Sequence, residues 1–375
     1  MLFFDMISRL SLMYLYKKKC GKWRVLSYNY LKGAPLSAFQ RKAENAFNMQ
    51  RVSRDMVKRC TLKDIAQVTG LTVNSVSRAL RDKSDIAPET KRRVMETAKE
   101  LGYVPNFAAS SLKKGKSFTV AIIFDNLFNP YYNIMTYYLT KYLSLHGYDF
   151  LTIINPNDKL RSKTFEKLLS KNVDGIISFL EPGEKFGEKL LMSRFPMTVI
   201  GRHCEQPRID YVYTDDVRGG YLATEYLIKS GCKNLEFVAD NLTVSCACER
   251  YEGFLRCVKE NNVAYDKLLM DGQTYSEAID KILKMRPDCD GIVCFNDYIA
   301  TEAQYVLEEK NKSQIKVIGY DNIRQEFKLP GSYATISADK DVLAKIAVEL
   351  LVQRMEGIYE GVSRRRVLEV ELVAR

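Results

Sequence analysis

The segment that most constrains the fold is the run that starts at Thr61 and reads TLKDIAQVTGLTVNSVSRAL. Thr61 and Asp64 stand at capping-box spacing, which predicts the start of a short first helix. Gly70 can adopt the left-handed conformation of a tight turn. A second helix is expected from Thr72 onward, with Val76 inward. The length of the two helices and the break between them are typical of a helix-turn-helix.

A third helix is expected to complete the same compact unit. It begins at Pro88, where the missing N–H costs nothing, and ends at Gly102. Val94, Ala98 and Leu101 recur at core spacing along it. Three short helices of this kind share one small hydrophobic core.

The second helix leaves several side chains outside that core. In a helix-turn-helix this helix enters the major groove, where Asn pairs with adenine and Arg with guanine. A solvated helix face would carry the same residue types, so the whole pattern favours DNA recognition more than any one residue does. The exposed candidates are Val73, Asn74, Ser75, Ser77, Arg78 and Arg81.

The positive charge is concentrated at the start of the chain. Residues 1–60 hold 13 Lys and Arg against 3 Asp and Glu, whereas residues 116–375 hold 34 against 37. A basic head on a slightly acidic body indicates a partner with a phosphate backbone, although a charged face is more often simply solvated.

From Thr61 to Asn106 the sequence resembles the DNA-binding head of the lactose/galactose repressor family, including the VSRAL core, the ETKRRV third helix and the LGYVPN exit. The likeness continues to about Arg375. It implies that Val73, Asn74 and Arg78 read bases, while other residues of the head hold phosphates. Ala87 departs from the serine that usually caps the third helix. The head positions expected to touch the phosphates or lie beside them are Thr61, Thr72 and Ser77.

The segment NFAASSLKKGKS that follows has the composition of a linker, because so short a run without a core cannot sustain a helix in water. The resemblance implies a hinge helix that folds on operator DNA. Leu112 would be the minor-groove wedge, with Ala109 beside it and Lys113 near the backbone. Ser110 stands where relatives usually carry an arginine.

Beyond Phe118 short apolar runs alternate with helical stretches, which predicts parallel sheets with helices on both faces. There are too many runs for one six-stranded sheet, so we expect two doubly wound subdomains with a ligand cleft between them. The fold resembles periplasmic sugar-binding proteins of the first type. No G-x-G-x-x-G follows the first strand, which argues against a dinucleotide fold. The expected strands are TVAIIF, DFLTII, DGIISF, MTVIGR, NLEFVA, GIVCFN, IKVIGY and VLEVEL.

Polar residues just after these strands are the effector-binding candidates. A polyol needs converging donors and acceptors beside an apolar or aromatic platform. Each residue alone could equally be a turn former or a helix cap. The resemblance favours Arg250, Asn296 and Asp321 most, and Lys340, which replaces a ring-stacking position of some relatives, favours a phosphorylated or acidic sugar slightly. The full set is Asp125, Asn129, Tyr131, Arg202, Asp216, Arg250, Asn296, Asp321 and Lys340.

The chain is therefore expected to have an all-α head, a hinge and an α/β sensing domain. The predicted boundaries are a basic extension at 1–58, the head at 59–105, the hinge at 106–116 and the effector-binding and dimerisation domain at 117–375. Within that domain one subdomain takes about 117–216 and 337–360, and the other about 217–336 and 361–375.

The first residues do not belong to this pattern. MLFFDMISRLSLMYLY is too short and too charged to span a bilayer, and no cleavage site of a signal peptide follows it. Met56 stands where relatives start, so we expect residues 1–55 to be an upstream extension without a folded role. The rival interpretations are a basic arm with non-specific DNA affinity and an amphipathic membrane contact.

These features predict a cytoplasmic repressor that binds operator DNA as a homodimer or tetramer and responds to a small molecule, most simply a carbohydrate. The alternatives are an activator or dual regulator, and a solute-binding protein, for which residues 61–113 would have no use. No nucleophile and base stand at a recognisable catalytic spacing, so an enzyme is not expected, nor are a metal site, a cofactor or a membrane partner. The nine cysteines lack metal-ligand spacing and indicate buried free thiols in a reducing compartment.

Overall fold

The computed structural model describes residues 60–104, 115–157, 159–270, 272, 274–328 and 332–374, together with two three-residue strands near the start. Those strands, β1 (Leu15–Lys17) and β2 (Trp23–Val25), pair antiparallel. The chain divides into two compact units, Met1–Pro105 and Asn106–Arg375. No helix among the described residues is long and apolar enough to cross a membrane.

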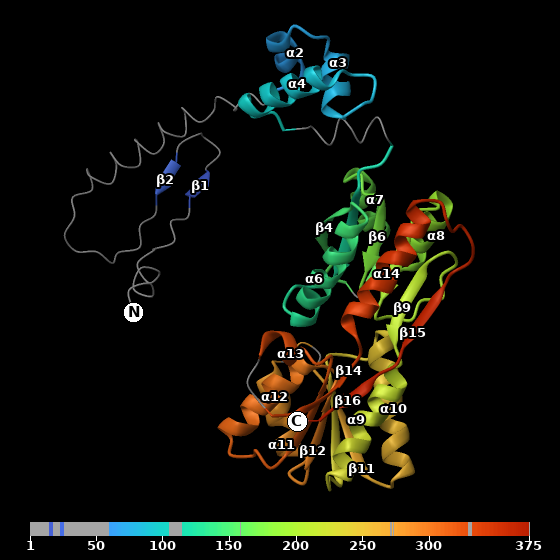
Figure 1. The fold of residues 1–375 in the computed structure, drawn as a ribbon. Coiled ribbons are helices and arrows are strands. Elements are labelled where there is room, and N and C mark those ends of the chain that lie inside the picture. Colours follow the sequence, from blue (N-terminus) through green and yellow to red (C-terminus); the bar gives the residue numbers. More distant parts are fainter. Residues whose placement is uncertain are drawn as a thin grey trace, which may run out of the picture. The chain divides into compact units, whose positions relative to one another are not determined.

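The first unit contains the three helices that the sequence predicts, α2 (Leu62–Thr69), α3 (Val73–Leu80) and α4 (Pro88–Glu100) (Figure 1). Gly70 adopts a left-handed φ of 69° at the end of α2. The core is small and consists mainly of β-branched and alanine side chains. Leu101 was expected inside, but it follows the last turn of α4 and is 40% exposed. The buried residues are Ile65, Ala66, Val76, Ala79, Val94 and Ala98.

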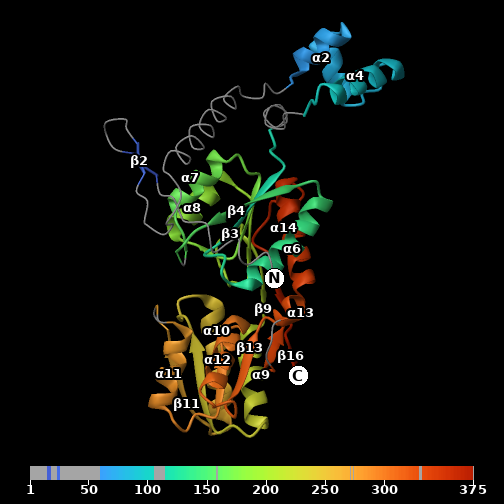
Figure 2. The same ribbon diagram turned by 90° about the vertical axis from the view of Figure 1, so that its left-hand side faces the viewer.

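The second unit consists of two lobes, each built on a six-stranded sheet (Figures 1 and 2). The sheet of the first lobe is wholly parallel, and α6 (Pro130–Leu145) and α14 (Lys340–Met355) cover one face side by side. α7 (Ser162–Ser170) and α8 (Glu184–Ser193) cover the other face. The strand order is β15 (Arg365–Leu368), β9 (Asp210–Thr214), β8 (Met197–Ile200), β6 (Gly175–Ser178), β3 (Thr119–Phe124), β4 (Asp149–Ile154). A separate two-stranded sheet joins β5 (Lys159–Leu160) to β7 (Glu181–Pro182).

The sheet of the second lobe is parallel except at its last strand, β16, which pairs antiparallel with β14. α9 (Asp216–Lys229) and α10 (Ser245–Glu260) pack on one face. α11 (Tyr275–Met285) and α12 (Asp297–Glu309) pack on the other, and a short α13 (Arg324–Phe327) follows β13. The strand order is β11 (Ala264–Leu269), β10 (Asn234–Ala239), β12 (Gly291–Cys294), β13 (Lys316–Tyr320), β14 (Ala334–Ser337), β16 (Glu371–Val373).

The chain crosses between the lobes three times, after β9, after β14 and between β15 and β16. The prediction that residues 361–375 all belong to the second subdomain is wrong for β15. The expected strand VLEVEL is two strands, because β15 pairs with β9 in the first sheet before the chain turns into the second. Strands β9, β11 and β14 were also missing from the expected set. Three segments of the chain therefore join the two lobes.

Candidate functional site

The solvent-facing side of α3 presents the residues that were expected to read DNA. Val73, Asn74, Arg78 and Arg81 are exposed, while Val76 is fully buried on the opposite side. The amphipathic pattern of α3 therefore fixes which side chains a partner can reach. Ser75 and Ser77 are half-buried.

The two threonines expected near the phosphates both begin helices. The Asp64 carboxylate accepts hydrogen bonds from the backbone N–H and the hydroxyl of Thr61, both at 2.7 Å. The Thr72 hydroxyl oxygen accepts from the backbone N–H of Ser75 at 3.1 Å. These caps set where α2 and α3 start. The hinge candidates Ala109, Leu112 and Lys113 lie outside the described residues.

Arg78 does not project freely from α3. Its guanidinium forms an ion pair with Asp85 in the loop that joins α3 to α4, and both side chains remain about half exposed. The same loop is tied to α4, because the Lys91 ammonium donates to the Asp82 carboxylate at 2.6 Å. The loop therefore holds a carboxylate beside the guanidinium on the exposed face.

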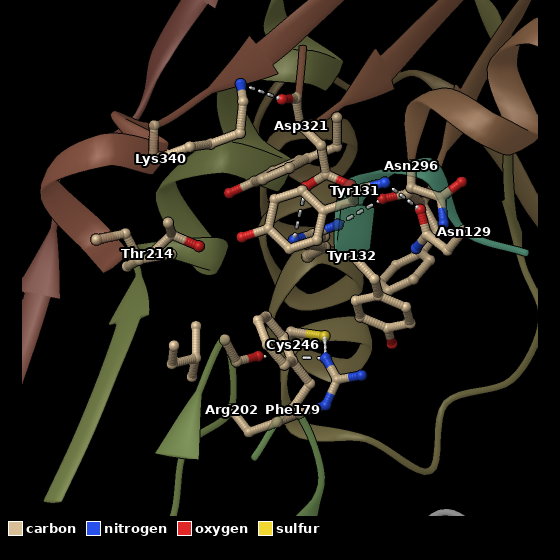
Figure 3. Close-up of a pocket in the computed structure, with 17 residues that line it drawn as sticks. Asn129, Tyr131, Tyr132, Phe179, Arg202, Thr214, Cys246, Asn296, Asp321 and Lys340 are labelled. Carbon is tan, nitrogen blue, oxygen red and sulfur yellow. Dashed lines mark hydrogen bonds and ion pairs between the residues drawn. The ribbon is translucent and has the colours of Figure 1, made fainter. Parts of the chain in front are cut away.

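A pocket lies between the two lobes of the second unit (Figure 3). Most of the predicted effector residues come together there, at the carboxyl ends of strands from both sheets, as expected for doubly wound folds. Asp125 lies nearby in an adjoining pocket, and Asp216 lies behind the wall. The predicted residues that line the pocket are Asn129, Tyr131, Arg202, Arg250, Asn296, Asp321 and Lys340.

Arg250 is the most constrained of these side chains. Its Nε donates to the fully buried Asp216 carboxylate at 2.8 Å, and its Nη1 donates to the carbonyl oxygen of Phe295 at 2.6 Å. The guanidinium also lies 3.5 Å from the centroid of the Tyr320 ring. Asp216 was expected to bind the effector directly. It instead orients Arg250, because the first residue of α9 points into the packing against α10.

The loop after β13 has an unusual backbone. Asp321 and Asn322 both have positive φ, 96° and 48°. The loop is held by the buried Asp297 carboxylate, which accepts from the backbone N–H of Ile323 at 2.9 Å. Burial raises the pKa of Asp297 to about 7. This network presents Asp321 toward the cleft, where one of its carboxylate oxygens lies 3.7 Å from Nη2 of Arg250.

Lys340 lines the pocket, but its ammonium is already occupied. Nζ donates to the carbonyl oxygen of Asp321 at 2.9 Å (Figure 3). It also lies 3.3 Å from a carboxylate oxygen of Glu326. Because the Lys340 ammonium is paired within the pocket wall, this residue gives less support to a phosphorylated or acidic sugar than its sequence position indicated.

The Arg202 guanidinium has fewer hydrogen-bond partners than the Lys340 ammonium has for its size. Its Nη1 donates to the carbonyl oxygen of Gly201 at 3.2 Å and contacts the sulfur of Cys246, which lies in the other lobe. Its Nε is buried and has no hydrogen-bond partner among the described residues. Burial raises the pKa of the Cys246 thiol to about 11, so that sulfur stays neutral at physiological pH. Arg202 therefore brings to the pocket an N–H donor, at Nε, that no described residue uses.

Asn129 and Asn296 combine two roles that the sequence left as alternatives. Each caps a helix, with its side-chain oxygen accepting from the backbone N–H of Tyr131 at 3.0 Å or of Ile299 at 2.9 Å. The cap leaves the amide nitrogen of each side chain as a donor. Both residues also line the pocket.

Two family models match the chain. One is described as "Bacterial regulatory proteins, lacI family" and matches residues 61–106. The other, "Periplasmic binding proteins and sugar binding domain of LacI family", matches residues 117–358, more than half of the chain. The chain belongs to the LacI family of bacterial regulatory proteins. The predicted family and fold class are confirmed, and this LacI-family chain is a DNA-binding transcription regulator with a small-molecule-sensing domain.

Curated relatives extend over nearly the whole regulator. The HTH-type transcriptional repressor PurR of Pasteurella multocida (strain Pm70) is 30% identical over 328 residues, which are 84% of this chain and 97% of the relative. The protein of the same name from Aliivibrio salmonicida (strain LFI1238) is 28% identical over 331 residues, 84% and 98% of the two chains. Both relatives are named as transcriptional repressors.

Solved structures show the same architecture. A LacI-family transcriptional regulator from Silicibacter pomeroyi is 26% identical, with a TM-score of 0.70 over 84% of this chain and 98% of that one. The Lac repressor bound to ONPG has a TM-score of 0.71 over 85% and 99% at 20% identity, a likeness of fold.

The sequence reasoning missed about half of the pocket lining in this LacI-family chain. Phe179 and Tyr320 are the last residues of expected strand runs and Phe295 is the last but one, so a rule that included strand ends would have found them. Thr214 and Ala338 adjoin strands that were not expected, and Cys246 comes from α10. The missed residues are Tyr132, Phe179, Ile200, Gly201, Thr214, Cys246, Phe295, Tyr320, Ala338 and Leu343.

Proposed function

We propose that this LacI-family chain represses transcription by binding operator DNA as a homodimer, and that a sugar held between the lobes changes its affinity for DNA. The observation that carries the DNA-binding part is the exposed face of α3, where Val73, Asn74 and Arg78 share one side of a helix whose other side is buried. Valine contacts thymine methyl groups, and Asn and Arg pair bidentately with adenine and guanine. Thr72 and Ser77 contact the flanking phosphates, Ala109 and Leu112 contact the minor groove, and Lys113 lies near the DNA backbone.

The cleft supports a polar, ring-shaped effector. Donors from Arg202, Asn129 and Asn296 stand beside Tyr131, Tyr132 and Phe179, a combination that suits hydroxyls on one side and an apolar ring face on the other. Structures of similar fold were solved with cellobiose, D-xylulofuranose and ribose, at TM-scores of 0.58, 0.59 and 0.61. They support a sugar for this chain without identifying which one.

The first lobe carries a surface that fits the homodimer. Tyr137 and Leu145 of α6 are 69% and 74% exposed, and the neighbouring edge strand β4 exposes Phe150 and Ile154. Exposed apolar side chains beside an open strand edge favour self-association, which in a twofold dimer uses the same patch on both copies. Light scattering of the full chain separates a monomer, a dimer and a tetramer. Because a regulator that binds operator DNA works in the compartment that holds the DNA, its proposed location is the cytoplasm.

Arg78 provides the test of DNA recognition. An operator is first selected by the full chain from a random DNA pool. Arg78→Ala should then weaken binding to that operator by about 1–3 kcal/mol and relax one base position, because a bidentate guanine contact is lost. Equal affinity of the two proteins for every sequence would contradict direct reading by Arg78. A reporter gene behind the same operator distinguishes repression from activation or a dual role.

A further inference from the structure

The cleft between the lobes consists of two connected chambers. The inner chamber is the pocket of Figure 3. The outer chamber adjoins it and shares five lining residues with it, among them Arg202. Its own walls come from both lobes and include Asp125, Phe128, Asp240, Tyr275 and Tyr298.

The two chambers differ in the room that they offer. The inner chamber has a cavity volume of about 70 Å³ and the outer chamber about 450 Å³. The inner chamber is therefore the narrower of the two. Its charged groups also bind one another, as Arg250 does with Asp216. In this arrangement of the lobes, a ring-sized group fits in the outer chamber.

The outer chamber has the chemistry of a neutral, hydroxylated ring site. Asp240 follows β10 and accepts a hydrogen bond from the Tyr275 hydroxyl. The Tyr275 ring packs edge to face on Tyr298, with centroids 5.3 Å apart. On the other lobe, Asp125 follows β3 and Phe128 is 83% exposed.

The two carboxylates determine which charge this chamber accepts. Burial raises the pKa of Asp240, and the nearby negative charge of Asp125, which lines the same chamber, raises it further. A phosphate or carboxylate placed between them would be repelled, whereas sugar hydroxyls can donate to both. Arg202 stands at the junction of the chambers with its unused Nε donor.

We propose that the outer chamber is a second sugar subsite, so that the effector is a disaccharide or other glycoside with one unit in each chamber. Its outer ring packs against Tyr275, Tyr298 and Phe128, and its hydroxyls donate to Asp125 and Asp240. Arg202 donates to the linkage between the units. This assignment rests on the proposed sugar effector and specifies how long that effector is and which end is uncharged.

The test is isothermal titration calorimetry of the full chain with matched ligands. The panel pairs the methyl glycosides of glucose, galactose, mannose and ribose with disaccharides that contain each unit, and adds the 6-phosphates of the hexoses. At least one disaccharide should bind ten times more tightly than either of its units. Tyr275→Ala should abolish that gain and change monosaccharide binding less than twofold, and Asp240→Asn should reduce the gain.

Tyr305→Ala is the matched control, because Tyr305 is an exposed tyrosine of the same lobe that lines neither chamber. Circular dichroism establishes that each variant is folded. A monosaccharide that binds as tightly as every disaccharide overturns the outer subsite and leaves the sugar effector standing. A disaccharide whose affinity is unchanged by Tyr275→Ala also overturns the subsite. If no sugar of either size binds, the proposed sugar effector fails, and the subsite fails with it.

Discussion

At the scale of single residues, the DNA-binding surface has a carboxylate, Asp85, paired with the arginine that is expected to read a base. Its ion pair with Arg78 holds the guanidinium in one orientation, and a pre-oriented arginine loses less entropy when it pairs with a base. Asp85→Asn should therefore lower discrimination at the base that Arg78 reads by about tenfold. The measurement compares affinities for the selected operator and for its single-base variants.

Asp82→Asn is the matched control, because it removes the same charge from the same loop and touches Lys91 instead of Arg78. If Asp85 acts only by repelling phosphates, both substitutions will raise the affinity for all sequences alike. That result would contradict an orienting role.

Glu236 makes stability depend on pH. It lies in β10 with only 4% of its surface exposed, and its Oε2 has no hydrogen-bond partner among the described residues. Burial, with Asp266 opposite it on β11, raises its pKa to about 7. Between about pH 4.5 and 7 the folded state keeps a proton that the unfolded state has lost, so stability falls as pH rises through this range.

Glu236→Gln removes that titration. The variant should be about 2–3 kcal/mol more stable than the parent at pH 8, where the penalty is fully developed, and little changed near pH 5. Denaturant unfolding at the two pH values measures the difference. Glu188→Gln, on the exposed side of α8, removes the same charge and should show no such pH dependence. Equal shifts at both pH values would argue against a buried carboxylate as the cause.

The roles of single residues could be predicted from the sequence where their hydrogen-bond partners lie close by along the chain. Thr61 with Asp64 and the caps at Asn129 and Asn296 follow from spacing alone, since the bonded groups are at most three residues apart. Asp216 and Lys340 could not be assigned correctly. Their partners lie 34 residues away for Asp216 and 14 to 19 away for Lys340, and only the tertiary packing brings them together.

At the scale of elements, the clearest predictions were central strands whose both faces are buried. TVAIIF and GIVCFN are central strands with continuous apolar runs. β11 lies at the edge of its sheet and exposes most of AYDKLL, so it lacks that pattern. β14 is buried but only four residues long, and two of them are polar. Apolar runs therefore indicate strands most clearly at the centre of a sheet, although the edge strand β4 also keeps such a run in DFLTII.

The packing of α9 against α10 leads to a prediction about Gly253. A Cβ at this position would collide with the carbonyl oxygen of Val217 on the facing helix. Backbone atoms cannot move aside as a side-chain end can, so Gly253→Ala should lower the unfolding free energy by about 1–3 kcal/mol. It should also weaken effector binding, because α10 carries Arg250 one turn earlier. Melting temperature and calorimetric affinity report the two effects.

Gly187→Ala separates this effect from a general cost of helical glycine substitution. Gly187 lies inside α8, and there a new Cβ would meet the flexible end of Gln206. We expect this control to melt near the parental temperature or above it, since alanine favours helix by about 1 kcal/mol. Equal losses in both variants would mean that the contact between α9 and α10 is not the cause.

At the scale of the whole molecule, the two lobes already contact each other along one wall of the cleft. The backbone N–H of His203, after β8, donates to the Ser245 hydroxyl at the start of α10 at 2.9 Å, and the neighbouring Arg202 contacts Cys246. A ligand that binds both lobes therefore adds to contacts that are present without it. Its effect on DNA binding can only be as large as its preference for one arrangement of the lobes over another.

The basic extension can be tested against the rest of the chain. The repressor relatives align over 97% and 98% of their own length with 84% of this chain, and the family match begins at residue 61. The family match thus leaves the extension out. Deleting residues 1–55 should leave operator affinity within about threefold at physiological salt. The slope of log K against the logarithm of the salt concentration should change by less than the amount that corresponds to about one phosphate contact. The titration is run with both proteins on the same selected operator. A steep loss of affinity that disappears at high salt would instead show that the 11 basic residues among positions 1–55 act as an arm on the DNA backbone.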